Sequence, residues 1–582
     1  MNLMSSKTDD MISGMFLSTA LAMIFTQVSG VIARIIDGVV TSSFLGAEAY
    51  SAVSLLAPFT DVILWLPVFI STGSQVLCSQ FTGKGNRNEA NSVFSLSIVL
   101  SLMIAALLIL LCLLIPDKLF EVCGVSLTEY PELYPHMLSY LQGYMFGIPA
   151  MTLIQVIGPM IVMDNNKSLF STSAALLCIT DIIGDLLNVY VFDGGVFGMG
   201  FASSVAFILQ LLYLFTHFLK KDSYFTFSLT SFNLSYLSGI ANAGSPTLVL
   251  RLATILRDIF INRINLAIAL SMAAVAARGM QNDINTLLFC IGLGIGKTMI
   301  TMTGIYYSVN DLYGLKRLLA CAIKVSIFLA GGSGIVVFIL SSNMAEFYTS
   351  DPEIIYLSAF SIQCMAVSLA FDSISLAFQN YLQGTQNLKM VNFMNFTDRF
   401  FVPIITAYIL GIYFGSMGIM ASVAVGKFLL VLIIFAVVCL RKKGLPTSFE
   451  DYMFLPKNFG GAKEDNIYSQ LSTVEEVKHE ANRAKDFCLT HKIDSQKSEL
   501  MAMLIEEIAG NIVRNGKSRN NQPVSIDYRL FVYEDRICLT LRDYCHKLNP
   551  VSHYDESDLT KQVKEIRYFG AFNSNNIIVF LN

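Results

Sequence analysis

The chain has 582 residues, of which 54% are apolar and 14% are charged, and its formal net charge is −4. Because a soluble protein usually carries about 25% charged residues, this composition excludes a wholly soluble enzyme. The small net charge gives no reason to expect a nucleic-acid partner. Of the 39 basic and 43 acidic residues, 37 lie in residues 446–582. We therefore predict a membrane domain followed by a soluble domain.

The cysteines and the N-terminal segment exclude two further classes of protein. The eleven cysteines fall singly, without a Cys-x-x-Cys pair, so neither a zinc site nor a disulfide framework is expected. The N-terminal segment MNLMSSKTDD lacks the basic start and the cleavage site of a signal peptide. We expect the first apolar stretch to be a retained helix, and we expect no metal and no required cofactor.

Long apolar runs fill the first 445 residues. A membrane-spanning helix needs about 20 mostly apolar residues, and twelve such runs can be distinguished. Their expected limits are 13–44, 52–80, 91–115, 136–162, 168–192, 196–219, 239–266, 273–305, 317–341, 354–383, 389–413 and 416–440.

The connecting loops predict the orientation of the chain. Twelve spans place alternate loops on opposite sides of the membrane, and one set of loops holds eleven basic residues against one, Lys118, in the other. The eleven are Lys84, Arg87, Lys167, Lys220, Lys221, Lys316, Arg317, Lys389, Arg441, Lys442 and Lys443. Basic loops stay on the cytoplasmic side. We predict a multi-pass protein of the cell membrane with both termini in the cytoplasm.

The spans divide into two halves of six that resemble each other. Ala52, Val53 and Asp61 match Ala274, Val275 and Asp283 at one offset. Six spans return the chain to the same side, so the halves share one orientation, as in other two-lobed transporters. We expect a first bundle at 1–220, an inter-lobe linker at 221–238 and a second bundle at 239–445.

Several segments resemble the multidrug and toxic compound extrusion (MATE) family of transporters. These are IDGVVTSSFLGAEAYSAVSLLAPF (36–59), GSQVLCSQFTGKGNRNEA (73–90), DIIGDLLNVYVFDGGVFGMGFASS (181–204) and FQNYLQGTQNLK (378–389). The resemblance covers about residues 10–442. It implies an all-α fold of twelve helices in two six-helix bundles around a central cavity, and export of drugs or metabolites in exchange for protons or sodium ions.

Acidic residues within the first half are candidates for ion coupling. Asp37 lies inside the first run, while Asp181, Asp185 and Asn188 share one face of the fifth because their spacings are four and three. A charge inside the bilayer is costly, so it must be paired, hydrated or functional. The resemblance implies that Asp37 and Asp185 match the ion-coupling acids of proton-coupled family members, while Asp181 stands where Asn is more usual. The structural alternative is that these acids bond to backbone exposed at a kink.

The second half carries a mixture of basic and acidic residues. Its candidates for the cavity or for ion binding are Arg257, Asp258, Arg263, Arg278, Asp283 and Asp372. We expect Arg257 or Arg263 to pair with Asp258, Asp283 or Asp372. The alternatives are that some arginines attract an anionic substrate, or that Asp258, Asp283 or Asp372 couples sodium.

After a linker at 446–469, residues 470–582 have the pattern of a soluble α/β domain. We predict helices at 472–491 and 494–516, two strands within 524–543 joined at Glu534 and Asp535, and a strand at 575–582.

The run EEIAGN (506–511) resembles the N-box of GHKL ATPases. The resemblance implies that Glu507 and Asn511 match the base and the magnesium ligand, and that Asp543 within LRDYCHKLNP (541–550) matches the Asp that contacts adenine. Tyr544 and Cys545 replace the glycines that usually follow, and backbone amides need glycines to approach phosphate closely. We therefore expect a degenerate domain, with ATP and Mg²⁺ as its candidate ligands.

These patterns favour a secondary active exporter, and not an enzyme, that exchanges H⁺ or Na⁺ for an amphipathic organic solute by alternating access. A lipid-precursor flippase of the same superfamily and a membrane-anchored ATP-binding sensor are the alternatives. The expected partners are the small-molecule substrate, the lipid bilayer and a cytosolic regulatory protein at the C-terminal domain, and the expected state is a monomer.

Overall fold

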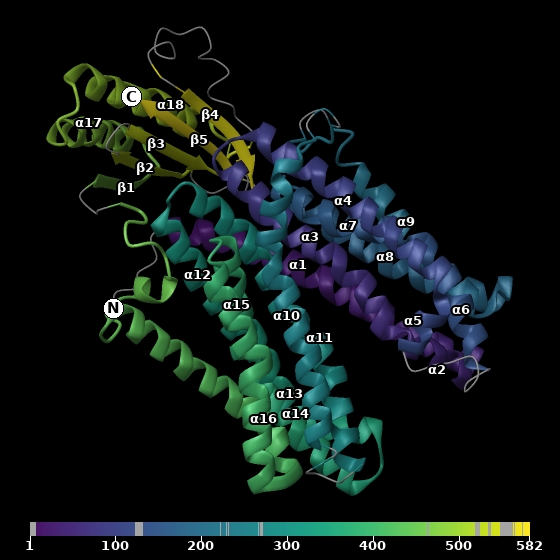
Figure 1. Cartoon of the computed structure of the whole chain (residues 1–582). Coiled ribbons are helices and arrows are strands. Elements are labelled where there is room, and N and C mark those ends of the chain that lie inside the picture. Colours follow the sequence, from purple (N-terminus) through teal and green to yellow (C-terminus); the bar gives the residue numbers. More distant parts are fainter. Residues whose placement is uncertain are drawn as a thin grey trace.

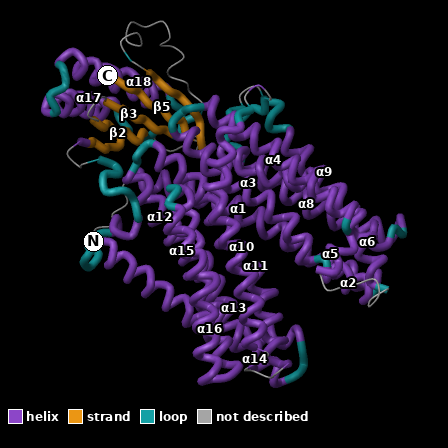
Figure 2. Tube along the Cα trace, viewed as in Figure 1, coloured by secondary structure: helices purple, strands orange, loops and turns teal. Residues whose placement is uncertain are grey.

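The computed structural model describes residues 7–122, 132–220, 223–228, 230, 232–265, 267, 272–461, 465–517, 524–532, 537–546, 563, 565–572 and 574–581. Figure 1 shows two bundles of helices that meet beside a β-sheet and diverge away from it, and Figure 2 shows that the strands gather in the C-terminal part of the chain. We call the side with the sheet the sheet end.

The first bundle comprises nine described α-helices. They are α1 (Lys7–Val40), α2 (Ala47–Leu55), α3 (Ala57–Gly83), α4 (Arg87–Leu114), α5 (Pro116–Val122), α6 (Leu133–Tyr144), α7 (Ile148–Met163), α8 (Lys167–Leu187) and α9 (Gly195–Phe215). A five-residue π-helical turn, Thr41–Leu45, extends α1, and another, Asn188–Phe192, extends α8. Such turns often mark functional sites, and the second one begins at a candidate ion-coupling residue.

The second bundle comprises seven described α-helices. They are α10 (Leu237–Ile264), α11 (Met272–Ser308), α12 (Leu312–Ser326), α13 (Gly332–Tyr348), α14 (Pro352–Gly384), α15 (Leu388–Phe396) and α16 (Val402–Lys442). Gly415 interrupts α16 with φ 60° and ψ −140°. Residues other than glycine rarely adopt a positive φ, so Gly415 provides the bend at which α16 reverses.

Ten helical segments of the described chain are long and apolar enough to cross a membrane. The predicted number was twelve, and two regions account for the difference. The segment Leu388–Lys442 covers 55 residues and includes both of the last two predicted spans. At 1.5 Å per residue it would measure roughly 80 Å, far more than the hydrocarbon core of about 30 Å. Helix α10 is the other region, because four charged residues lower its hydropathy: Arg251, Arg257, Asp258 and Arg263.

The two bundles touch through glycines, and we call this region the inter-bundle contact. A Cβ atom at Gly73 of α3 would overlap the backbone oxygen of Ile240 of α10, and one at Gly244 of α10 would overlap that of Phe69. Gly294 lies against the backbone of Ile24, and Gly304 lies against Ser79. Small residues let helix backbones approach closely, so the bundles are joined backbone to backbone.

The C-terminal domain is a five-stranded sheet with two helices on one face. Its strands are β1 (Asn466–Leu471), β2 (Ile526–Val532), β3 (Ile537–Asp543), β4 (Glu565–Ala571) and β5 (Ser574–Leu581), and its helices are α17 (Val474–Thr490) and α18 (Ser495–Asn515). The order is β1-β2-β3-β5-β4, and each described neighbour is antiparallel. Both predicted helices and the strands β2, β3 and β5 are confirmed. The turn predicted at Glu534 and Asp535 lies outside the described residues.

Alternation along the strands gives this sheet two different faces. Residues such as Tyr528, Leu539 and Val579 form the domain core with α17 and α18. Ile578, one position along β5, instead belongs to the apolar cluster that includes Met160 and Ile305 of the helical bundles. Successive side chains of a strand point to opposite faces. The second face of the sheet is therefore buried against the membrane domain.

The inter-bundle contact leads to a stability prediction. Replacing Gly73 with Ala should lower the free energy of unfolding by about 1–3 kcal/mol, because the new methyl group must displace backbone. The measurement is denaturant unfolding of the full chain in detergent. Gly14→Ala is the matched control, since nothing lies within 4 Å of a Cβ at Gly14. Equal stability of the two variants would contradict this account of the inter-bundle contact.

Candidate functional site

Three carboxylates gather in the interior of the first bundle. Asp37 on α1 and Asp181 and Asp185 on α8 are all buried, Asp185 with only 1% of its surface exposed. They are close enough to interact electrostatically, and the phenol of Tyr140 on α6 lies beside them. The structure thus brings the predicted acids together, and it adds Tyr140, which the sequence analysis did not single out.

The polar atoms of this group have few partners. Thr41 donates a hydrogen bond of 3.4 Å to Asp37 Oδ1. Among the described residues, the Oδ1 atoms of Asp181 and Asp185 accept no hydrogen bond, and none of the three acids forms an ion pair. Buried acids that lack an ion pair are stable when they carry a proton or hold a cation that comes from outside. These three acids are therefore candidates for loading and releasing an ion.

Asn188 ties the same group to the junction between α8 and α9. Its Nδ2 donates to the backbone oxygen of Gly195 at 2.9 Å, and a Cβ at Gly198 would overlap its side chain. Asn188 also begins the π-helical turn that extends α8. It is thus a candidate for positioning this turn next to the acids of α8.

A second buried group lies inside the second bundle and is balanced in charge. Lys427 Nζ of α16 lies 2.6 Å from Asp372 Oδ1 of α14 and 2.5 Å from Asp398 Oδ1. Arg399 lies 3.5 Å from Asp372 and 3.6 Å from Asp398. Two acids and two bases thus neutralise each other, and we call these four residues the second-bundle quartet.

The quartet changes the expectation for Asp372. Arg257 or Arg263 was expected to pair with Asp258, Asp283 or Asp372, but the partners of Asp372 are Lys427 and Arg399. Asp398 and Lys427 were missed. The signal was present for Lys427, because a single lysine in the apolar run VAVGKFLLVL needs a partner inside the membrane.

The remaining second-bundle candidates lie elsewhere. Arg257 pairs with Asp258 at 2.9 Å, as predicted, and Arg278 lies 3.8 Å from the same carboxylate. Arg263 and Asp283 are exposed. Within the described residues, neither of these two forms an ion pair. The six candidates therefore do not form one site.

In the C-terminal domain, Glu507 and Asn511 lie on α18 and Asp543 ends β3. Asn511 accepts a hydrogen bond of 2.6 Å from Asn515. Asp543 is buried and accepts hydrogen bonds of 2.8 Å from Cys545 N and Asn575 Nδ2. One oxygen of the Asp543 carboxylate is therefore used for hydrogen bonds within the domain. Binding of ATP or Mg²⁺ at these residues stays a prediction, and so does membership of the GHKL family.

Comparison with known proteins identifies the class of the membrane domain. The family model MatE matches residues 22–182 and 259–409, which together are more than half of the chain. The protein therefore belongs to the MatE family and is a multi-pass membrane transporter. It is 22% identical over 440 residues to the multidrug export protein MepA of Staphylococcus aureus (strain MSSA476), covering 72% of this chain and 92% of MepA. It is 18% identical over 416 residues to the multidrug resistance protein MdtK of Yersinia pseudotuberculosis, covering 68% and 87% of the two chains.

Solved structures agree on the fold. The outward-facing conformation of a multidrug resistance MATE transporter of the MOP superfamily matches with a TM-score of 0.69 at 18% identity, over 75% of this chain and 98% of that one. The Vibrio cholerae MATE transporter VcmN in its bent form matches with a TM-score of 0.69 at 16% identity, over the same shares. The helical part of the chain thus has the MATE fold.

The second-bundle quartet leads to a prediction about Lys427. The variant Lys427→Met should lower the free energy of unfolding by about 3–5 kcal/mol, because it leaves one buried carboxylate without a cation. The double variant Lys427→Met with Asp398→Asn should recover part of this loss, since it restores neutrality.

Denaturant unfolding of the full chain in detergent provides the measurement. Lys324→Met is the control, because Lys324 is exposed on α12. A Lys427→Met variant as stable as this control would show that the quartet does not hold the second bundle together.

Proposed function

We propose that the protein is a secondary active exporter that exchanges protons for an amphipathic organic solute by alternating access. The observation that carries this proposal is the group of Asp37, Asp181 and Asp185, which is buried and without ion pairs among the described residues. Protonation removes the cost of burying such charges. The group is therefore suited to pick up a proton on one side of the membrane and to release it on the other.

A contrast between the bundles supports the first bundle as the coupling site. Asp372 and Asp398 in the second bundle already have Lys427 and Arg399 as internal counter-ions. An added cation would have to compete with a lysine at 2.5–2.6 Å. This makes the second-bundle quartet a poor sodium site and leaves the first-bundle acids as the ion carriers.

The transport cycle follows from the shape of the molecule. The bundles touch near the sheet end and diverge away from it (Figure 1). Rocking of two bundles about a shared contact exposes the space between them to one side at a time. With α10 and both parts of Leu388–Lys442 counted as spans, twelve crossings are expected. The basic loops favour a cytoplasmic sheet end, which supports bundles that diverge toward the outside.

The test is export from proteoliposomes that hold the full chain. Asp37→Asn and Asp185→Asn should each reduce export driven by an imposed proton gradient at least tenfold, because an amide cannot carry the proton. Asp193→Asn is the matched control, because Asp193 is exposed just after the π-helical turn, and Asn is well tolerated at its positive φ of 48°. Protein yield and thermal unfolding check that each variant folds.

A parallel experiment imposes a sodium gradient in place of the proton gradient. Export driven by a sodium gradient alone would identify Na⁺, and not H⁺, as the coupling ion. Undiminished export by both Asp37→Asn and Asp185→Asn would remove the coupling role of the first-bundle acids. The same measurements without residues 446–582 show whether the C-terminal domain is required.

A further inference from the structure

Two cations of the second bundle lie on helix faces that contact the first bundle. On α10, the residues at positions 240, 244, 247 and 251 follow at intervals of three or four, so they share one face. Ile240, Gly244 and Thr247 on that face contact α3. Arg251 is the next in the series, and its guanidinium carbon lies 4.9 Å from the centre of the Trp65 ring on α3.

Helix α11 repeats this pattern. Gly294 and Gly304 lie against the first bundle, and Thr301 is hydrogen-bonded to Gln75 of α3. Lys297 has the spacing of the same face, and its backbone oxygen accepts a hydrogen bond of 3.2 Å from Gln75 Nε2. Lys297 is also close enough to Arg251 for the two charges to repel. We call Arg251 and Lys297 the inter-bundle cations.

The carboxylates near the inter-bundle cations are shared with other cations. Asp61 lies 3.9 Å from Arg34 and is also close enough to attract Arg251, and Asp258 lies near both Arg257 and Arg278. Among the residues that the structure describes, neither Arg251 nor Lys297 forms an ion pair with a carboxylate. Both side chains are half-buried. Two neighbouring positive charges that form no close ion pair in apolar surroundings are costly, and an incoming anion relieves that cost.

We infer that the inter-bundle cations bind the acidic group of the substrate, so that the transported solutes are amphipathic organic anions. The inference rests on the proposed export function and names its substrate class. Lys297 and Arg251 hold the carboxylate, sulfonate or phosphate group, while the Trp65 ring and the neighbouring apolar helix faces contact the apolar part. A phosphate group could come from a soluble metabolite or from a lipid-linked precursor, and the chemistry of recognition is the same for both.

The first experiment measures binding, which does not depend on transport. The full chain in detergent is titrated with a fluorescent naphthalene sulfonate and with ethidium as a lipophilic cation. Lys297→Met and Arg251→Met should each weaken sulfonate binding at least tenfold. Lys297→Arg should retain it, and ethidium binding should be equal or tighter in the two Met variants. Lys324→Met, which removes an exposed lysine on α12, should change neither.

The second experiment measures gradient-driven export of the same two dyes and of a polyisoprenyl phosphate. Export of the sulfonate alone indicates soluble anions, and movement of the polyisoprenyl phosphate indicates a lipid-linked source. Preference of the unchanged protein for ethidium, with Lys297→Met unaltered, would overturn the substrate assignment while leaving the export function intact. Sulfonate binding that depends on Lys297, without any gradient-driven export, would instead overturn the export function and preserve the site.

A separate observation concerns the C-terminal sheet, which contacts both bundles. On the first bundle, Arg567 donates a hydrogen bond to the backbone oxygen of Lys84, and Phe572 N donates to Met163 O at 3.3 Å. On the second bundle, Arg529 Nη1 donates to Val309 O at 3.1 Å, and Arg542 lies 3.7 Å from Asp311. One rigid sheet thus bridges the two bundles at the end where they touch.

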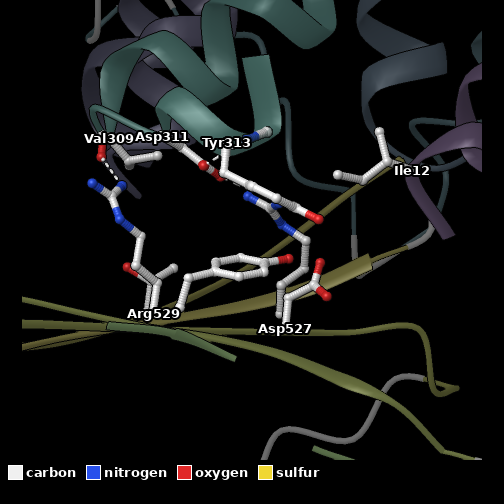
Figure 3. Close-up of a pocket in the computed structure, with 10 residues that line it drawn as sticks. Ile12, Val309, Asp311, Tyr313, Asp527 and Arg529 are labelled. Carbon is white, nitrogen blue, oxygen red and sulfur yellow. Dashed lines mark hydrogen bonds and ion pairs between the residues drawn. The ribbon is translucent and has the colours of Figure 1, made fainter. Parts of the chain in front are cut away.

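The contact with the second bundle is tightly packed. Figure 3 shows Arg529 and Asp527 of the sheet below Val309, Asp311 and Tyr313 of the second bundle. The rings of Tyr313 and Tyr468 have centroids 4.2 Å apart, and the guanidinium carbon of Arg542 lies 4.4 Å from the centre of the Tyr306 ring. The cavity between these side chains measures about 10 Å³, space for about one water molecule. The region is a packed interface.

The geometry points to the sheet as a clamp that holds the two bundles together at the sheet end. This second inference also rests on the alternating-access cycle, since that cycle requires the same ends to separate. A sheet bonded to both bundles opposes the separation, so it must leave at least one of them during each cycle. Binding of a ligand or a partner to the domain could then set the transport rate through the occupancy of the clamp.

The test links the sheet to each bundle with a short thiol-specific cross-linker. Tyr313→Cys with Tyr468→Cys links it to the second bundle, and Asn165→Cys with Gly570→Cys links it to the first, since Asn165 lies 3.0 Å from a Cβ at Gly570. Both links together should abolish export, and cleavage of the linker should restore it. One link alone should leave export at least partly active.

The unchanged chain treated with the cross-linker is the control, because its described cysteines are buried or half-buried. Full export by protein in which both cross-links have formed would contradict the proposal that the sheet acts as a clamp. Export by the uncross-linked variants in the same experiment shows that the transport cycle itself is intact. A failure of the clamp proposal can therefore be told from a failure of the proposed export function.

Discussion

The arrangement of charge inside the bilayer is the constraint on which the rest of this structure depends. A charged side chain in apolar surroundings must be neutralised by a neighbour, hydrated or used. The second-bundle quartet satisfies this constraint internally, with Lys427 between Asp372 and Asp398. Among the described residues, the acids around Asp185 form no ion pair, and the inter-bundle cations form none with a carboxylate. The groups left without a described partner are the ones that an ion and a substrate would complete.

The separation of these groups gives each a distinct role. The first-bundle acids lie within one bundle, so an ion bound there can change the shape of that bundle alone. The inter-bundle cations lie on α10 and α11, which both contact α3 of the other bundle. A solute bound there senses the distance between the bundles. In the proposed cycle, coupling between ion and solute would pass through the packing of the first bundle, where the π-helical turn at Asn188 is the candidate deformable element.

Much of the fold could be predicted because hydropathy alone specifies membrane helices. The run 13–44 corresponds to Ile12–Leu45. Asp181 and Asp185 were grouped from helical spacing, while the resemblance to the MATE family linked Asp37 to Asp185. Pairing across distant segments could not be predicted. Asp398 and Lys427 are 29 positions apart, and only the turn of α16 at Gly415 brings their segments together. The strands β1 and β4 were missed because half-buried edge strands such as NIYSQL show weak alternation.

The glycine contact between the bundles has a consequence for how often it can be broken. Helices that interlock through large side chains must withdraw each one before they part, and every side chain must find its place again on return. At Gly73, Gly244 and Gly294 the nearest atom of the other bundle belongs to the backbone. Two smooth surfaces can detach as whole bodies and re-join in the same register. A contact of this kind suits a transporter whose bundles must separate and re-join once in every transport cycle.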